Sequence, residues 1–599
     1  MIPTIRHRRP FAVVASFLLL LAVAAPAAIA KEPKTTDVQI LAINDFHGQL
    51  EVVPPVVSSS GRIGSLQGTA PNQTCIPGGT PNCIPAGGAE YLATWVRDLR
   101  ATNPSATAFV TAGDNIGATP LLSALFHDEP TIEALNLMGL DFASVGNHEF
   151  DEGTAELLRM QNGGCHPVDG CADGDGFAGA DFQYLAANVT YRAGQPLAGQ
   201  TIFPPYAIKT FPGNVKVAFI GMTLEGTPLI VSPDGITDIS FHDETETVNA
   251  LADELVDQGI EAIVVLLHEG GNVAASGNGA GNVGAINSCL SPTGPIPDMV
   301  PNFNDEIDIV ITGHTNWALN CMIDGKLVTG AAAQGRLVTD IDAQISRATG
   351  DFITSSFHVN NTIVTQDVPK AKDITKLIAK YNVFAGPIAS VIVGNTTAAM
   401  DRTITNSGGE SSLGRLIADA QLASAVEAGT GAQFAFMNPG GIRANLDAGD
   451  ITHGEAFSVQ PFSNIVTTMT LTGTQIDTML EQQFTINTGS SAGQLRSSNT
   501  ILLPSTGFTY TWDASQPGGS RVDPTTIKFN NVTIDPAGTY RVVVNNFLST
   551  GGDDFPILIQ GTNKVTGDDD LVALEAYLAD HNPYTPIDVI ANPQITRLN

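Results

Sequence analysis

Residues 146–151 read Gly146-Asn147-His148-Glu149-Phe150-Asp151 and directly follow a short apolar segment, Phe142 to Val145. The apolar segment is typical of a buried strand, and four of the six residues after it are polar or charged. In open α/β sheets, sites form beyond the carboxyl ends of strands. This block therefore predicts a functional site at one edge of a sheet.

Four other predicted strands end in the same way. They span Val38 to Ile43, Thr107 to Ala112, Ala262 to Leu267 and Ile307 to Ile311. The polar residues that follow them are Asp45, His47, Asp114, His268 and His314. Helical stretches such as Glu90 to Leu99 and Glu244 to Gln258 lie between the strands, and this alternation predicts a layered α/β domain.

The polar residues at these strand ends carry the donor atoms of a two-metal centre. Asp, His and Asn side chains offer ligands that Zn²⁺, Mn²⁺ and similar ions accept. Asp45 and His47 are two residues apart, which points both side chains to one side of an extended segment. Asp114 is placed to bridge two ions, which at about 3.5–4 Å separation can clamp a phosphoryl group. The sequence predicts two divalent ions and leaves their identity open.

The C-terminal part of the chain carries a second group of candidates. A predicted strand, Phe434 to Met437, is followed by Asn438-Pro439-Gly440-Gly441-Ile442-Arg443. Glycines let the backbone approach a ligand, and arginine can bind a phosphate with two hydrogen bonds. Phe462 and Phe547 lie in loops rich in Asn, which favours exposed rings that stack on a flat base.

On these motifs the chain resembles the calcineurin-like metallophosphoesterases, and more closely the secreted bacterial 5′-nucleotidase family. The resemblance implies an α/β fold: a four-layer sandwich of two mixed sheets flanked by helices, then a smaller α+β domain that binds the substrate. The expected division is a signal peptide at 1–30, a metallophosphoesterase domain at 36–366, a helical linker at 367–390 and a C-terminal domain at 391–599.

The resemblance implies a role for each residue of the metal centre. The first ion would be bound by Asp45 and His47, the second by Asn147, His268 and His314, and Asp114 would bridge them. His148 would face the phosphate, oriented by Asp151, and stabilise the transition state or protonate the leaving oxygen. Members usually have His or Gln where this chain has Asn316, as a further ligand to the first ion. Because Asn is shorter than Gln, we expect a weaker first site.

The resemblance also implies a set of substrate-binding residues. They are Asn438, Gly441, Arg443, Phe462, Phe547 and Asp553, with Arg415 as a further candidate at a position where many members have Asn. The two Phe would stack on the base and Asp553 would contact the ribose.

The implied activity is the release of phosphate from nucleoside 5′-monophosphates. Alternatives on the same centre are a 2′,3′-cyclic nucleotide phosphodiesterase and a nucleotide-sugar hydrolase. A sulfur-transferring hydrolase of the same fold would leave both Phe rings unexplained. A non-catalytic surface protein that retains the fold would have lost its ligands, and here only Asn316 is unusual.

The N-terminus and the charge indicate where the protein acts. Arg6, Arg8 and Arg9 precede an apolar run, and Ala28-Ile29-Ala30 fits a signal-peptidase site. The apolar run is short for a membrane anchor, so we expect a secreted protein, extracellular or periplasmic, without a stable membrane anchor. A net charge of −32 disfavours long nucleic acid as a partner and leaves a small nucleotide as the expected substrate. The oligomeric state is not predicted.

Six cysteines in an exported chain predict disulfides. Six cysteines allow 15 pairings. We expect neighbours to pair, as Cys75–Cys83, Cys165–Cys171 and Cys289–Cys321, with free buried thiols as the alternative. Five of the six lie in the Gly/Pro/Asn-rich insertions 51–88, 161–181 and 271–303, which suits surface loops.

Overall fold

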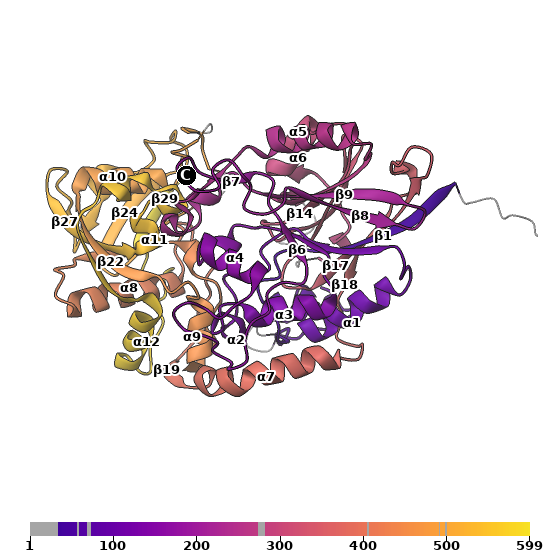
Figure 1. Ribbon diagram of the computed structural model, residues 1–599. Helices are drawn as coiled ribbons and strands as arrows, with labels where there is room; N and C mark the ends of the chain where they lie inside the picture. The colour runs from indigo at the N-terminus through magenta and orange to yellow at the C-terminus, as the bar shows by residue number, and fades with distance from the viewer. Residues whose placement is uncertain are drawn as a thin grey trace, which may run out of the picture. The chain divides into compact units, whose positions relative to one another are not determined.

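Two six-stranded mixed sheets organise the N-terminal half of the chain (Figure 1). The computed structural model describes residues 34–56, 59–68, 73–273, 282–403, 406–489, 492–496 and 500–599. The predicted signal peptide, residues 1–30, lies outside the described residues. Among the described residues, no helix has the length and apolar character needed to cross a membrane.

The first sheet is antiparallel on one side and parallel on the other. Its order is β18 (His358–Ile363), β17 (Leu337–Ser346), β1 (Thr35–Ile43), β4 (Thr107–Thr111), β5 (Phe142–Ser144) and β6 (Gln183–Leu185). Strands β1, β4, β5 and β6 are parallel, whereas β17 runs antiparallel to β1. Parallel neighbours bring their carboxyl ends to the same edge, as the sequence predicts.

The second sheet has a parallel centre and an antiparallel strand at each edge. Its order is β15 (Ala318–Ile323), β16 (Lys326–Ala331), β14 (Ile307–Thr312), β11 (Ala262–His268), β9 (Val215–Thr223) and β8 (Tyr206–Phe211). Strands β16, β14, β11 and β9 are parallel, and the two edge strands are antiparallel. Strands β11 and β14 therefore also end at one edge.

Alternating side chains on the strands build four layers. On β1, Leu41 and Ile43 pack in a core with helices α1 (Ala89–Arg100), α3 (Glu129–Met138) and α7 (Lys372–Ala389), whereas Ile40 faces the second sheet. On β11, Val264 faces the first sheet, and Val265 packs against α5 (Glu244–Asp257) and α6 (Pro295–Met299). The helices therefore cover the outer face of each sheet (Figure 1), and the predicted four-layer sandwich is confirmed.

The C-terminal part is a smaller α+β unit, as predicted. Its main sheet has the order β23 (Leu503–Pro504), β20 (Phe434–Met437), β27 (Thr539–Asn545), β22 (Ile465–Thr472) and β28 (Thr562–Asp569). A second sheet has the order β26 (Val532–Thr533), β25 (Lys528–Phe529), β24 (Phe508–Asp513) and β29 (Ile595–Leu598). On β20, Ala435 packs with helices α8 (Ser412–Glu427) and α12 (Asp570–Asp580), whereas Phe436 packs with α10 (Gly473–Gln482) and β24.

Shorter elements complete the described chain. They are β2 (Arg62–Gly64), β3 (Cys83–Pro85), α2 (Leu121–Ala124), α4 (Thr154–Asn162), β7 (Val189–Tyr191), β10 (Ile239–Phe241), β12 (Asn272–Val273), β13 (Pro292–Thr293), β19 (Ile392–Thr396), β21 (Gly449–Thr452), α9 (His453–Val459) and α11 (Asn546–Ser549). Helix α7 falls within the predicted linker and contacts α2, α3 and α9. The exact domain boundaries stay a prediction.

The three predicted disulfides are present. Cys75 is bonded to Cys83, Cys165 to Cys171 and Cys289 to Cys321, and no cysteine is free. The first two bonds each close a short segment within one insertion. The third joins the insertion 271–303 to β15, which fixes that insertion against the second sheet.

Candidate active site

Side chains from both sheets meet where their parallel strands end. The Oδ2 atom of Asp114, after β4, lies 3.1 Å from Nε2 of His268 at the end of β11. The same oxygen lies 3.8 Å from Nε2 of His47, which follows β1. Asp114 therefore links the two strand-end groups that the sequence predicts.

Two sets of donor atoms share this carboxylate. Asp45, His47 and Asp114 form one set, and Asp114, His268 and His314 form the other; within each set the donor atoms lie within 4.8 Å of one another. A bridging carboxylate between two such sets is the arrangement that a two-metal centre requires.

Asn147 completes the second set. Its Oδ1 atom lies 2.9 Å from Nδ1 of His314 and 3.1 Å from Nε2 of His268. An ion with tetrahedral bonds of about 2.1 Å has neighbouring ligand atoms about 3.4 Å apart. The observed spacings are close to that value, so these atoms already surround one point.

Backbone carbonyls orient two of the imidazoles. Nδ1 of His268 lies 2.7 Å from the oxygen of Ala112, and Nδ1 of His47 lies 2.9 Å from the oxygen of Gly117. A carbonyl accepts a hydrogen bond, so Nδ1 of each ring carries a proton, and in the neutral ring the lone pair is on Nε2. Both Nε2 atoms face Asp114 in the state that binds a metal.

The carboxylate of Asp45 is placed to bind a cation. Its Oδ1 atom is buried and has no hydrogen-bond partner, although Oδ2 accepts from Nδ2 of Asn44 at 2.6 Å. Burial raises the pKa of Asp45 to about 7, against the opposing effect of His268. A buried carboxylate oxygen without a donor is costly, and a divalent cation would satisfy it. The residues present therefore fit a pair of divalent ions.

Several of these residues adopt the left-handed backbone region. The φ angles are 49° at Asp45, 47° at His47, 52° at Asp114 and 63° at His314. Non-glycine residues rarely adopt such angles, and those that do cluster at functional sites. The chain turns sharply after each strand and so directs each side chain back to the common centre.

Glu149 organises the loops around the centre, a role that the sequence did not reveal. Its buried carboxylate accepts hydrogen bonds from the backbone N–H groups of Asp114 at 2.9 Å, Asn115 at 2.8 Å and Gly146 at 2.6 Å. One side chain thereby ties the loop after β4 to the loop after β5. Its place inside the polar block 146–151 is the only signal in the sequence.

His148 and Asp151 form a pair beside the metal ligands. Nδ1 of His148 lies 2.8 Å from Oδ2 of Asp151. Burial opposes a charge on the imidazole, but the carboxylates of Asp151 and Asp114 outweigh it and raise the pKa of His148. The backbone N–H of His148 also donates to Oδ1 of Asp114 at 2.9 Å. The pair therefore holds a proton next to the centre.

A cavity of about 540 Å³ joins this centre to the C-terminal part of the chain. Ten of the predicted site residues line it: Asn147, His148, Asp151, His314, Asn438, Gly441, Arg443, Phe462, Phe547 and Asp553. The Phe462 ring stacks on the imidazole of His148, with centroids 5.8 Å apart and 12° between the planes. The guanidinium of Arg443 lies 5.7 Å from the centre of the Phe462 ring.

Hydrogen bonds fix the far wall of the cavity. Nδ2 of Asn438 donates to Oδ2 of Asp553 at 2.8 Å, and Nδ2 of Asn545 donates to Oδ1 of Asn438 at 3.0 Å. The Phe547 ring lies directly over Gly552, where an added Cβ would come within 2.5 Å of the ring. Glycine at this position therefore allows the ring to reach the cavity.

Arg415 lies away from the cavity, and Asn316 bonds the backbone beside the centre. Arg415 is buried on α8 in an ion pair with Glu410 and is not among the cavity-lining residues. Its length and charge serve this internal pair, which the sequence pattern did not reveal. Asn316 has a φ of 60° and donates from Nδ2 to the backbone oxygen of His314 at 3.2 Å. Its role as a metal ligand stays a prediction.

Comparisons with known proteins agree with this geometry. The family model of the calcineurin-like phosphoesterases matches residues 38–317, and that of the 5′-nucleotidase C-terminal domain matches residues 392–560. Endonuclease YhcR of Bacillus subtilis is 33% identical over 549 residues, which are 90% of this chain and 39% of that protein. The chain therefore spans well under half the length of YhcR.

Two further proteins resemble the chain over most of its length. Cell wall protein Lmo0130 of Listeria monocytogenes is 30% identical over 572 residues, which are 91% of this chain and 67% of that protein. The crystal structure of a 5′-nucleotidase precursor from Thermus thermophilus has a TM-score of 0.69 at 24% identity, covering 94% of this chain and 100% of that one. The chain belongs to the 5′-nucleotidase family of calcineurin-like phosphoesterases.

Proposed function

We propose that the protein hydrolyses nucleoside 5′-monophosphates to a nucleoside and inorganic phosphate, outside the cytoplasm. The observation that carries the proposal is the shared cavity. Its wall includes His148 and Asn147 of the metal-type centre and also Arg443, Phe462 and Phe547 of the C-terminal part. One nucleotide could therefore place its phosphate at the metal-type centre and its base between the rings of Phe462 and Phe547.

The centre would hold two divalent ions. The first would be bound by Asp45 and His47, the second by Asn147, His268 and His314, with Asp114 shared. Bound there, such ions polarise phosphoryl oxygens and lower the pKa of a bound water. The preset tautomers of His47 and His268 and the unpaired oxygen of Asp45 support this assignment.

Two side chains would act on the phosphate itself, and a third would orient one of them. The guanidinium of Arg443 can bind two phosphoryl oxygens with parallel hydrogen bonds. His148 holds a proton because Asp151 accepts from its other ring nitrogen, so the imidazole can stabilise developing charge or protonate the leaving oxygen. Asp151 fixes the ring orientation and keeps the charged form favourable.

The C-terminal side would bind the nucleoside. Phe462 and Phe547 offer aromatic faces to a base, and stacking on such faces tolerates different bases. Asp553 is held by Asn438 and offers a carboxylate to ribose hydroxyls. A site that contacts the base mainly through stacking would accept several nucleotides.

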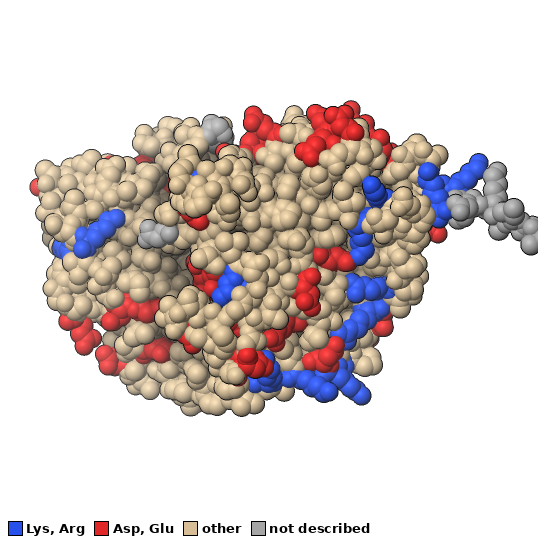
Figure 2. Space-filling model, in the orientation of Figure 1, with Lys and Arg blue, Asp and Glu red and all other residues tan. Residues whose placement is uncertain are grey.

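Other phosphate esters would use the same residues. A 2′,3′-cyclic nucleotide or a nucleotide sugar carries a base for the rings and a phosphodiester or pyrophosphate for the centre. The name of YhcR, an endonuclease, is a reason to test diesters. Long nucleic acid is disfavoured by the net charge of −32 and by the acidic side chains along α5, Glu246, Asp253, Glu254 and Asp257 among them (Figure 2).

Export is supported by two observations. The three disulfides of the structure form in oxidising compartments. The first 30 residues have the composition of a signal peptide. N-terminal sequencing of protein recovered from the culture medium or periplasm would test this part, with Lys31 as the expected first residue.

Phosphate release from a panel of esters tests the activity. The panel contains AMP, 2′,3′-cyclic AMP, UDP-glucose and ATP, with and without Mn²⁺. We expect the highest kcat/KM for AMP and a loss of release after chelation. Metal-dependent turnover of the cyclic ester or UDP-glucose well above AMP would replace the proposed substrate by one of the alternatives. No release from any ester, by protein with two bound ions, would contradict the proposal.

A further inference from the structure

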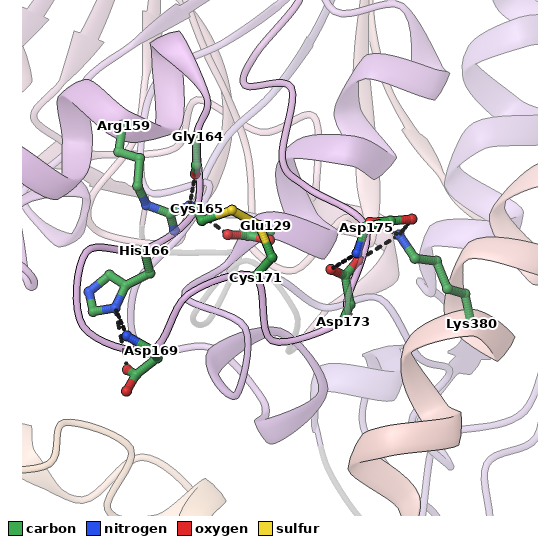
Figure 3. The surroundings of a disulfide bond; sticks show 10 residues. All are labelled: Glu129, Arg159, Gly164, Cys165, His166, Asp169, Cys171, Asp173, Asp175 and Lys380. Carbon is green, nitrogen blue, oxygen red and sulfur yellow. Dashed lines mark hydrogen bonds and ion pairs between the residues drawn. A yellow bond between two sulfur atoms is a disulfide. The ribbon is translucent and has the colours of Figure 1, made fainter.

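A second cluster of metal-binding side chains lies beside the cavity, apart from the centre around Asp114. It consists of His127, His166 and Asp169, whose donor atoms lie within 4.8 Å of one another. His127 lines the cavity just before α3. His166 and Asp169 belong to the loop that the Cys165–Cys171 disulfide closes (Figure 3). The reaction proposed above uses none of the three.

The carboxylate of Asp169 contacts both histidines of the cluster. Its Oδ2 atom lies 2.9 Å from Nε2 of His127 and 3.3 Å from Nδ1 of His166. The two imidazoles are stacked, with centroids 3.7 Å apart and 16° between the planes. Both rings therefore present a nitrogen to one carboxylate. Two imidazoles and a carboxylate are a donor set that Zn²⁺ and related ions accept.

A hydrogen bond shows which nitrogen of neutral His166 would serve as a ligand. The backbone N–H of Asp169 donates to Nδ1 of His166 at 3.2 Å, so the ring proton is on Nε2, and an ion at Nδ1 would replace this long hydrogen bond. The Nδ1 atom lies 3.3 Å from Oδ2 of Asp169, which is also an acceptor. Two acceptors at this distance repel each other, and a cation that both contact removes the repulsion.

Glu152 gives His127 the partner that metal-bound histidines usually have. Its Oε2 atom lies 2.8 Å from Nδ1 of His127. A carboxylate at one ring nitrogen holds the proton there and leaves the opposite nitrogen for a metal. That opposite nitrogen, Nε2, is the one that faces Asp169.

The loop is anchored on both sides of the disulfide. Before it, Nη1 of Arg159 donates to the backbone oxygen of Gly164 at 2.7 Å. After it, Nζ of Lys380 on α7 lies 2.7 Å from Oδ2 of Asp173 and 3.0 Å from Oδ2 of Asp175 (Figure 3). The donors are thereby held near one another before any ion binds, which lowers the entropy cost of binding. No thiol competes, since every cysteine is in a disulfide.

We propose that His127, His166 and Asp169 bind a further divalent ion of the zinc type, separate from the ions of the Asp114 centre. This ion joins the disulfide-closed loop to the cavity wall, and Glu152 orients His127 for it. The site is built from the fold around the substrate cavity and does not depend on which ester the enzyme hydrolyses.

Zinc content per chain tests the proposal. The full-length proteins are loaded with Zn²⁺, freed of unbound ion and measured by elemental analysis. His166→Ala removes one donor, and Asp169→Asn replaces the charged carboxylate by a neutral amide of the same shape, which is a weaker ligand. His358→Ala removes an exposed histidine on β18 and is the matched control.

The expected result is one zinc ion fewer per chain in both variants than in the natural protein and the control. In an Asp114→Asn background, the ion that remains should be lost on adding His166→Ala. Equal zinc content in the natural, His166→Ala and Asp169→Asn proteins would overturn the proposal. Loss of an ion from His358→Ala as well would also overturn it, because the loss would then not be specific to the cluster.

Discussion

The imidazole of His148 lies face to face with the ring of Phe462, with centroids 5.8 Å apart and 12° between the planes. His148 follows a strand of the first sheet, whereas Phe462 precedes β22 of the C-terminal part. This contact places the group proposed for proton transfer beside a ring proposed for base binding. The substrate would therefore be held at both ends by neighbouring side chains.

Replacing Phe462 by alanine should weaken substrate binding more than it slows the chemical step. Loss of a stacking face costs about 1–3 kcal/mol per base, so KM for AMP should rise about 5-fold to 150-fold. Phe462→Trp retains a stacking face and should stay near the natural KM. Steady-state kinetics on AMP checks this. An unchanged KM in Phe462→Ala would show that the ring does not bind the base.

His148→Asn should lower kcat for AMP by about a hundredfold or more, the scale of a lost acid or charge-stabilising group. The Nδ1–Asp151 pair and the place of His148 in the cavity are the reasons. Metal content should remain that of the natural protein. If the variant instead loses bound metal, His148 is a ligand and its proposed role is wrong.

Asn316→His should tighten the first metal site. The amide of Asn316 bonds the backbone of His314, and an imidazole is longer and offers a ring nitrogen that divalent ions accept. We expect the Mn²⁺ concentration for half-maximal phosphate release to fall by about tenfold, because one added ligand that contributes about 1.4 kcal/mol raises the affinity by that factor. The same concentration in both proteins would mean that position 316 does not face the ion.

Glu149→Gln should destabilise the fold. An amide keeps one acceptor oxygen and places an NH₂ group against backbone N–H donors, so buried donors lose their partner. The free energy of unfolding should fall by about 1–3 kcal/mol. Glu246→Gln, at an exposed position on α5, is the control and should change little. Urea denaturation of both variants under the same metal conditions measures the two free energies of unfolding. Equal values would show that Glu149 does not stabilise the fold.

Local patterns of the sequence predicted a layered α/β domain and the polar residues at its strand ends, and the family resemblance implied the four-layer sandwich. The apolar strand at Ala262 to Leu267 and the helix at Glu90 to Leu99 occur within a residue or two of the predicted ends. The helix predicted at Glu244 to Gln258 spans Glu244–Asp257, and the side chain of Asp243 caps its first turn. Such features depend on periodicity and turn chemistry, which are local.

Contacts between distant segments could not be predicted in the same way. Arg415 stands where many family members have Asn, and its ion pair with Glu410, although close in sequence, depends on how the fold buries the start of α8. The bonds of Glu149 to the loop after β4 exist only after the strands align. The meeting of His127 with Asp169 across the disulfide-closed loop also has no sequence signal, since each residue is ordinary in its own segment.

Asp114→Ala tests the central claim most directly, because Asp114 belongs to both sets of donor atoms. The measurement is metal content by elemental analysis together with phosphate release from AMP at saturating Mn²⁺. The account predicts that the variant loses ions from the centre and that turnover falls by at least about a thousandfold, the scale of a lost main electrostatic stabiliser. Near-natural phosphate release from a variant that holds no metal would contradict it.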